Sequence, residues 1–205
     1  MPRRLPRAFY DRPTLDVARD LLGARLVRVE NGRRIAGIIT ETEAYCGEAD
    51  LGCHAKAGRT KRTDPLYGPP GHAYVYFTYG NHWMLCPVTR PEGQPEAVLV
   101  RAIHPTESID RIAARRGQQP QAKWTDGPGK LTQALGIDGT LNRTDLTRRD
   151  APLFIEQGVA IPDRLVTTTP RIGLYTVPEP WKSIPWRFLA TLPVDFDLTR
   201  PAGQT

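Results

Sequence analysis

The sequence predicts an α+β fold: a single compact domain with a mixed, largely antiparallel sheet, flanking helices and a protruding β-hairpin. Its strand patterns occur in neighbouring pairs joined by tight turns, instead of alternating with helices as in a doubly wound sheet. The chain of 205 residues is long enough to bury one core, and neither a repeat nor a domain-scale linker divides it. We therefore expect residues 14–198 to form the domain, between a flexible basic arm of residues 1–13 and a C-terminal tail of residues 199–205.

Two hairpins account for the strand pairing that we expect. Asn31-Gly32 is the strongest short hairpin signal in the chain and separates two alternating segments. Gly80-Asn81 is a second turn between two strand-like segments rich in aromatic residues. The paired segments are 25–30 with 33–45, and 73–79 with 82–89.

Helices are predicted where a capping residue or proline precedes a helical pattern and a glycine follows it. Thr14 and Thr106 are suitable caps, Pro128 suits a first helical turn, and Gly23 and Gly117 are suitable ends. The expected helices are 15–22, 106–116 and 128–135. Further strands are expected at 97–103, 153–156 and 171–177, and the proline-rich segment 178–185 is expected to be a turn region.

Composition narrows the class of protein and its surroundings. The formal net charge of +6 favours a polyanionic partner, although charge alone does not establish one. The three cysteines allow at most one disulfide, no apolar leader precedes them, and no apolar run is long enough to span a membrane. We expect free thiols in a reducing compartment, hence a cytoplasmic protein that is not secreted and that associates with the nucleoid if it is bacterial. Cys46, Cys53 and His54 have no second pair at zinc spacing, so no metal is expected.

The segment Glu41-Thr-Glu-Ala-Tyr45 holds the first candidate for chemistry. Side chains two apart share a face of a strand, so Glu41, Glu43 and Tyr45 point the same way at its far end. Carboxylates beside an aromatic ring can have a raised pKa and act as general acid or base. Taken alone, a solvated glutamate at a strand end is the commoner explanation.

The second hairpin adds aromatic candidates. Tyr74 and Tyr76 share one face, and Tyr79 falls at the turn beside Gly80. Aromatic residues on strands usually pack against a core. In a basic protein they can also form a stacking surface for bases, with a bulky wedge at the tip. Residues 46–72 between the two hairpins have no period, and a loop of that length is usually functional.

Five motifs in order carry a resemblance to a known family. They are Glu41-Thr-Glu-Ala-Tyr45, His54, Gly71-His-Ala-Tyr-Val-Tyr-Phe-Thr-Tyr-Gly80, Val98-Leu-Val-Arg-Ala102 and Gly127-Pro-Gly-Lys-Leu131. From about Arg12 to the Trp186-Arg-Phe region, the chain resembles the alkyladenine (3-methyladenine) DNA glycosylase family. The resemblance implies a monomeric, monofunctional glycosylase without cofactor. Such an enzyme flips a damaged purine out of double-stranded DNA and hydrolyses its N-glycosidic bond, which initiates base excision repair.

The resemblance also implies roles for individual residues. Glu43 matches the family's general base, and Arg101 matches an arginine that positions the attacking water. An ordinary ion pair of Arg101 with Glu43 or Glu41 is compatible with that role. The remaining matches are Tyr45, His54 and Tyr76 in an aromatic base pocket, and Tyr79 as the intercalating residue. Lys130, near a helix N-terminus, and Arg59, in the basic loop, are expected to contact the DNA backbone. No lysine nucleophile is needed, so lyase activity is not expected.

One position departs from the family pattern. Most members have an asparagine in the base pocket, where it obstructs the 2-amino group of guanine, and this chain has Cys86 there. Cys86 is therefore expected to line the pocket and to leave room for alkylguanines beside 3-methyladenine and hypoxanthine. Pro87 removes a backbone donor and suggests a strand edge or bulge, which would instead withdraw residue 86. The alternative function is a non-catalytic protein that binds distorted duplex DNA.

Overall fold

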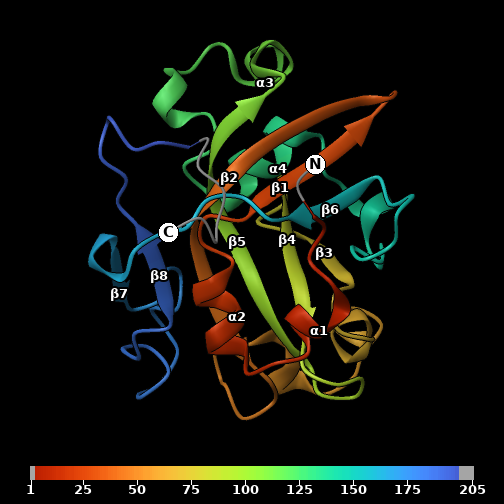
Figure 1. The fold of residues 1–205 in the computed structure, drawn as a ribbon. Helices are drawn as coiled ribbons and strands as arrows, with labels where there is room; N and C mark the ends of the chain where they lie inside the picture. The colour runs from red at the N-terminus through yellow and green to blue at the C-terminus, as the bar shows by residue number, and fades with distance from the viewer. Residues whose placement is uncertain (1–2, 199–205) are drawn as a thin grey trace.

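The computed structural model describes residues 3–198, and in that range one antiparallel sheet of eight strands packs against a few short helices (Figure 1). The strand order is β3-β4-β5-β2-β1-β6, with β8 also beside β2 and β7 beside β8. All described strand pairs are antiparallel. The prediction of a mixed sheet was therefore wrong in that respect, and the prediction of largely antiparallel pairing was right. The strands are β1 (Arg25–Glu30), β2 (Arg33–Cys46), β3 (Ala73–Thr78), β4 (His82–Thr89), β5 (Glu96–Glu107), β6 (Leu153–Glu156), β7 (Val166–Thr169) and β8 (Arg187–Ala190).

Strand β2 is the centre of the sheet. It pairs with β1 through the predicted Asn31-Gly32 turn, whose two residues both have positive φ as this turn requires. On its other side it pairs with β5 over most of its length, and near Glu41–Glu43 it also pairs with β8. Register shifts interrupt the β2–β5 pairing on both sides of Glu41, where Arg101 is the unpaired residue of β5.

Short helices cover one buried cluster built on this sheet. They are α1 (Arg7–Tyr10), α2 (Thr14–Asp20), α3 (Ile109–Arg116) and α4 (Pro128–Leu135), with 3₁₀ turns at His54–Ala57, Asp64–Tyr67, Gln121–Lys123, Gly139–Leu141 and Asp163–Leu165. Val17 of α2, Ile112 of α3 and Leu131 of α4 are fully buried in the same cluster as Ile38 and Val100 of the sheet. Burying such side chains stabilises the fold by about 1.5–3 kcal/mol each.

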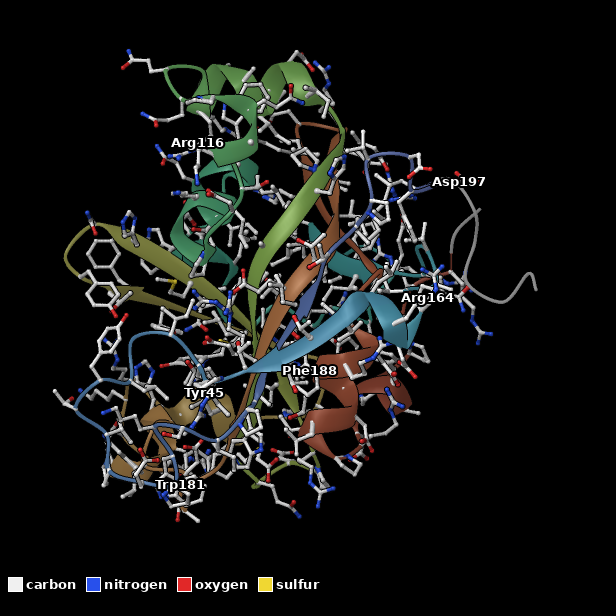
Figure 2. The ribbon with its side chains drawn as sticks, turned by 90° about the vertical axis from the view of Figure 1, so that its left-hand side faces the viewer. Tyr45, Arg116, Arg164, Trp181, Phe188 and Asp197 are labelled. Carbon is white, nitrogen blue, oxygen red and sulfur yellow. The ribbon has the colours of Figure 1, made fainter. Side chains whose placement is uncertain are left out.

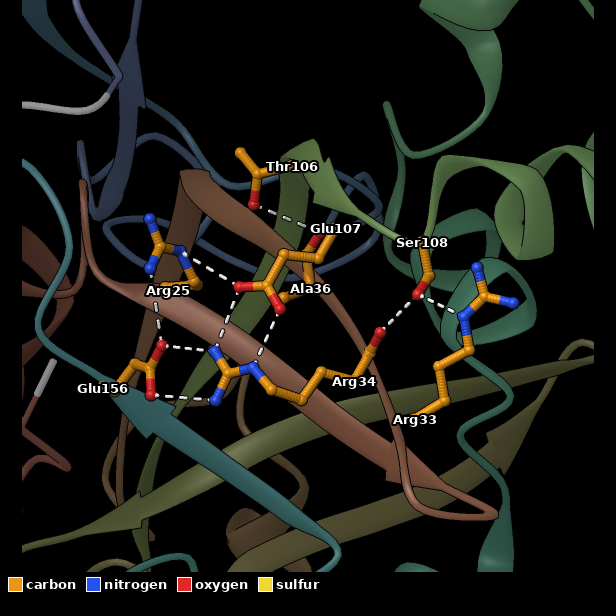
Figure 3. A network of polar contacts seen from close by, with 8 residues as sticks. All are labelled: Arg25, Arg33, Arg34, Ala36, Thr106, Glu107, Ser108 and Glu156. Atoms are coloured by element: carbon orange, nitrogen blue, oxygen red, sulfur yellow. Dashed lines mark hydrogen bonds and ion pairs between the residues drawn. The ribbon is translucent and has the colours of Figure 1, made fainter. Parts of the chain in front are cut away.

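A charged network holds four strands together at the opposite end of β2 from the Glu43 region (Figure 3). Arg34 of β2 donates to both oxygens of Glu107 on β5, at 2.8 and 3.0 Å, and at 2.6 Å to Glu156 on β6. Arg25 of β1 lies 3.5 Å from the same Glu156. These hydrogen bonds hold the pKa of Glu107 below its ordinary value, so the network is charged at neutral pH.

The network also explains a wrong prediction. The helix expected at 106–116 begins only at Ile109, because β5 continues to pair with β2 as far as Glu107, beyond a register shift at Ala36/Gly37. Ser108 then takes a left-handed conformation with φ 53° and ends the strand. Thr106 is no helix cap, since its hydroxyl lies 3.4 Å from the Ala36 carbonyl.

The other boundaries differ for similar reasons. Helix α2 begins at Thr14, whose hydroxyl bonds the Thr89 hydroxyl at 2.7 Å instead of capping the helix. The strand expected at 171–177 is absent, because these residues form turns. Strands β7 and β8, which lie on either side of that region, were not predicted; each has only four residues.

The predicted basic arm packs on the domain over its described part. Leu5 and Tyr10 are buried in the main cluster. The backbone of Arg4 forms an isolated antiparallel β-bridge with Glu156, Arg7 donates to Asp145 at 2.6 Å, and Arg12 donates to Asp20 at 2.9 Å. These apolar anchors and ion pairs make residues 3–13 part of the folded body, while residues 1–2 and the predicted tail 199–205 lie outside the described range.

The second hairpin, β3–β4, leaves the sheet and positions the site. Its two strands pair from Ala73–Pro87 to Thr78–His82, but β4 pairs with β5 only at Val88 and Thr89. Beyond these two pairs the hairpin diverges from β5 and extends away from the body at the left of Figure 2. Because Pro87 lacks an N–H group, it suits a strand that is losing its partner on one side.

Candidate functional site

A cavity of about 420 Å³ opens where the hairpin diverges from the sheet. Its walls come from β2, β3, β4 and β5, from the 46–72 loop, from the start of α4, and from residues 170–186, which we call the β7–β8 loop. Of the predicted site residues, seven line it: Tyr45, His54, Tyr76, Tyr79, Cys86, Arg101 and Lys130. Residues from 45 to 130 along the sequence are therefore brought to one concave surface.

Glu43 lies directly behind this lining and is fully buried. Its Oε2 accepts the Tyr45 hydroxyl at 2.8 Å and the Nη1 of Arg101 at 3.3 Å. Its Oε1 accepts the backbone N–H of Ile172 at 2.7 Å. All three donors belong to residues that line the cavity, so the carboxylate is held by the cavity wall itself.

Burial raises the pKa of Glu43, and it does so despite the opposing charge of Arg101 and the hydrogen bonds from Ile172 and Tyr45. A carboxylate with a raised pKa is a stronger base once it is ionised. The raised pKa of the Tyr45 phenol, caused by burial and by the nearby Glu43 charge, keeps that hydroxyl a donor.

Arg101 pairs with both carboxylates on this face of β2. Its Nε donates to Oε1 of Glu41 at 2.7 Å, and Arg187 of β8 donates to the same oxygen at 2.6 Å. The ion pairs considered from the sequence are thus both present, while Arg101 still reaches the cavity. Burial lowers the pKa of Arg101, but the charges of Glu43 and Glu41 outweigh it and keep the guanidinium protonated.

The β7–β8 loop covers Glu43 and is fastened by a buried ion pair. Arg171 donates to both oxygens of Asp50, at 2.5 and 2.8 Å, and both side chains are fully buried. The Arg171 guanidinium also lies 4.7 Å from the centre of the Tyr45 ring. Figure 2 shows Tyr45 and Trp181 at the same end of the molecule, where Arg171 also donates to the Trp181 carbonyl at 3.3 Å. This anchor fixes the Ile172 amide against Glu43.

Aromatic rings form the side of the cavity on β3 and on the 46–72 loop. Tyr74 and Tyr76 stack at 4.8 Å between ring centres, and His54 meets Tyr76 edge-on at 4.7 Å. His54 Nδ1 lies 3.1 Å from the Tyr74 hydroxyl. Burial, with the charges of Arg62 and Lys56, lowers the pKa of His54 to about 4, so the imidazole is neutral at pH 7.

Cys86 is buried and lines the cavity. It pairs in register with Tyr74 across the hairpin, and its neighbour Pro87 pairs with Ala73. Pro87 therefore does not withdraw residue 86 from the cavity, and the thiol belongs to the same buried group as Tyr74, Cys53 and Met84.

Tyr79 lies at the hairpin turn, with φ 53°, and its side chain is 77% exposed. A left-handed conformation is uncommon for a residue with a bulky side chain. The hydroxyl of Tyr79 lies 3.5 Å from the point where a Cβ on Gly173 would stand. The hairpin tip thus reaches across the cavity mouth to the β7–β8 loop.

The two predicted backbone-contacting residues lie in different places. Lys130 of α4 lines the cavity and donates to Asp126 at 2.8 Å. Arg59 does not line it, but donates to Asp64 at 2.6 Å in a separate depression of about 350 Å³, which Arg143 and Lys61 also line. Both arginines there are exposed and share the Asp64 carboxylate.

Several cavity residues were not assigned to the site from the sequence. Tyr74 was a candidate for a stacking surface, on the strand face of Tyr76, but it was not placed in the base pocket. His82 and the α4 start also meet at the cavity, where a Cβ on Gly129 would lie 2.7 Å from the imidazole of His82. Met84 shares the strand face of Cys86. The other lining residues are Gly52, Cys53, Leu66, Thr78, Ala97, Leu99, Ile172, Gly173 and Leu174.

Within residues 3–198, no three His, Cys, Asp or Glu side chains come together as a metal site. In the same range no helix is long and apolar enough to cross a membrane.

The family model and the most similar relatives that we compared agree with one another. The family model described as methylpurine-DNA glycosylase matches residues 8–192. A protein of Carboxydothermus hydrogenoformans is 47% identical over 184 residues, covering 90% of this chain and 93% of the relative. One of Chlorobaculum parvum is 44% identical over 199 residues (97% and 92%), and one of Salinibacter ruber is 46% identical over 182 residues (83% and 86%). All three carry the name "Putative 3-methyladenine DNA glycosylase".

Proposed function

The chain belongs to the methylpurine-DNA glycosylase family and is a DNA repair hydrolase, and from that premise we propose how its cavity recognises and excises a base. The enzyme acts as a monomer on double-stranded DNA that contains 3-methyladenine, hypoxanthine or related damaged purines. It flips the damaged nucleotide into the cavity and hydrolyses the N-glycosidic bond with water activated by Glu43. The observation that carries the proposal is the buried Glu43, held by three residues of the cavity wall.

The shape and lining of the cavity suit a flipped purine. Its volume of about 420 Å³ is within the usual range for small-molecule sites. Tyr45, Tyr76 and the neutral His54 offer ring faces and edges for stacking, and a positively charged alkylated base gains a cation–π attraction from the tyrosines. Flipping costs roughly a few kcal/mol, which these contacts must offset.

Glu43 is suited to act as general base. Each carboxylate oxygen has two acceptor sites, and within residues 3–198 Oε1 uses one, for the Ile172 amide. A water bound at the second site would lie beside Ile172, at the cavity wall. Glu43 would take a proton from this water as it attacks C1′, and its charge would stabilise the positive sugar as the base leaves. The charge of Arg101 favours the ionised form of Glu43, and its guanidinium would orient the water.

Tyr79 is proposed as the wedge that fills the gap left by the flipped nucleotide. It is exposed, at the tip of a hairpin and at the mouth of the cavity. Lys130, in the cavity lining, and Arg59, in the separate depression, are proposed to contact phosphates of the DNA backbone. Each contact releases counterions, so the log–log salt dependence of DNA affinity should lose about one unit of slope on Lys130→Ala or Arg59→Ala.

Cys86 is proposed to widen the range of bases. A thiol has fewer atoms than an asparagine side chain and offers no carboxamide to obstruct a 2-amino group. Its place in the cavity lining, opposite Tyr74, supports this. We therefore include alkylguanines among the substrates.

An excision assay tests the proposed function. Excess protein is incubated with a duplex carrying one hypoxanthine, or with methylated DNA, and the products are analysed with and without alkali. We expect release of the free base and strand cleavage only after alkali. A protein that binds the damaged duplex tightly yet leaves no alkali-labile site would instead be the non-catalytic DNA-binding alternative.

A further inference from the structure

Tyr175 is an exposed aromatic residue beside the cavity. Its side chain is 78% exposed, as much as that of Tyr79. It is the second residue of a turn in which the Val177 N–H donates to the Leu174 carbonyl at 3.1 Å. An aromatic ring at an exposed turn corner loses contact with water only when a partner covers it.

The turn that carries Tyr175 follows directly on the cavity wall. Ile172, Gly173 and Leu174 all line the cavity. The hydroxyl of Tyr79 lies over Gly173, so the hairpin tip and this turn meet at the cavity mouth. Ile172, which lines the cavity, is also exposed, and we call Tyr79, Ile172 and Tyr175, on the hairpin tip and on this turn, the aromatic and apolar rim.

This turn is anchored on both sides. Arg171 is fixed by the buried pair with Asp50. Leu174 packs against Gly52, where a Cβ would lie only 2.7 Å from Leu174 Cδ1. The backbone that carries Tyr175 is therefore fixed. Less conformational entropy is lost when a partner binds to the Tyr175 ring than if this turn were mobile.

Resting on the proposed function, we propose that Tyr175 is a second DNA-stacking residue, which packs on a base beside the flipped nucleotide. We take nucleic acid to be the partner that covers this rim, because the rim continues from the base cavity and because basic side chains lie beside it. Lys130 lines the cavity, and Arg62 donates to the Phe77 carbonyl of the hairpin at 3.1 Å. Aromatic residues on such rims stack on bases of any sequence.

The test measures single-turnover excision against enzyme concentration for wild type, Tyr175→Ala and Tyr175→Phe. Val194→Ala is the control, because it removes a fully exposed apolar side chain outside the cavity lining. We expect Tyr175→Ala to raise the half-saturating concentration about tenfold with a maximal rate within about twofold of wild type, since stacking contributes equally before and during bond cleavage. Tyr175→Phe keeps the ring and should behave as wild type.

A second readout locates the contact. 2-Aminopurine is placed at each neighbour of the lesion and opposite it, and its fluorescence is followed on binding. Quenching at one of these positions by wild type and Tyr175→Phe, lost in Tyr175→Ala, supports the proposal. An unchanged half-saturating concentration in Tyr175→Ala overturns it, as does a Tyr175→Phe variant as weak as Tyr175→Ala. Absence of excision by wild type would instead count against the proposed function.

Discussion

The cavity has two walls that differ in how they are built. The sheet wall, from β2 to β5, is regular backbone whose side chains follow strand alternation. The opposite wall, the β7–β8 loop, has no regular structure and is fixed by the Arg171–Asp50 pair. Glu43 stands between them, because it belongs to β2 and accepts the Ile172 amide of the loop. The difference teaches that this site depends on local strand alternation on one side and on a few long-range contacts, chiefly the Arg171–Asp50 pair and the Ile172–Glu43 hydrogen bond, on the other.

Breaking the loop's anchor should have the largest effect. Asp50→Asn leaves the Arg171 charge buried without a counter-charge, so the free energy of unfolding should fall by about 3–5 kcal/mol. Urea denaturation measures this. Asp150→Asn is the control, because it removes an exposed pair with Arg148 and should leave the midpoint unchanged. Equal midpoints for Asp50→Asn and wild type would mean that the loop is held by other contacts.

Glu43→Gln tests the residue that both walls share. The amide keeps the shape but cannot take a proton, so the single-turnover rate should fall by about two orders of magnitude or more. DNA affinity should persist. In wild type, the rate should fall as pH drops through the raised pKa of Glu43, because only the ionised form is a base. Glu48→Gln, outside the cavity lining, should excise normally; near-normal excision by Glu43→Gln would remove Glu43 from the mechanism.

Cys86→Asn alters the sheet wall alone. Restoring a polar obstruction should lower excision of methylguanine relative to hypoxanthine by about tenfold, since such discrimination is typically about 1–3 kcal/mol. The measurement is the ratio of single-turnover rates on the two duplexes. Cys53→Ser, a change at the other cavity-lining cysteine, controls for loss of sulfur. A ratio that stays constant would show that residue 86 does not contact the base.

The smallest expected effect concerns His54 and pH. The pKa of His54 is about 4 in the folded protein, below the ordinary 6.5. Between about pH 4 and pH 6.5 the unfolded chain therefore binds a proton at His54 that the folded chain does not bind. The contribution of His54 to stability is thus present above about pH 6.5 and is lost as pH falls towards 4. His54→Gln should flatten the dependence of the melting temperature on pH in this window, whereas exposed His104→Gln should not. The same pH dependence in both variants would contradict the burial argument.

Sequence reasoning succeeded for the sheet wall because strand alternation is local. Glu41, Glu43 and Tyr45 were expected on one face of a strand, and the hydrogen bonds among them and Arg101 require that arrangement. The Asn31-Gly32 turn was predicted for the same reason, since two residues determine its geometry. The roles of these residues in catalysis stay predictions until they are measured.

The loop wall was missed because nothing local specifies it. Arg171 and Asp50 are 121 positions apart, and neither lies in a motif that points to the other. The segment 171–177 has apolar residues in a strand-like order, but Arg171 turns inward and Gly173 takes φ +87°, which breaks the extended backbone. Predicting this wall requires knowing that β8 pairs with β2.

The three free cysteines lie in or beside this cavity, and their burial has a consequence for the durability of the protein. Burial raises the pKa of Cys46 to about 12 and of Cys53 to about 11, and it raises that of Cys86 as well. Only the thiolate is an effective nucleophile. An enzyme that repairs alkylated DNA works where electrophilic alkylating agents are present. The raised pKa of its own buried thiols keeps them neutral and therefore makes them poor targets for those agents.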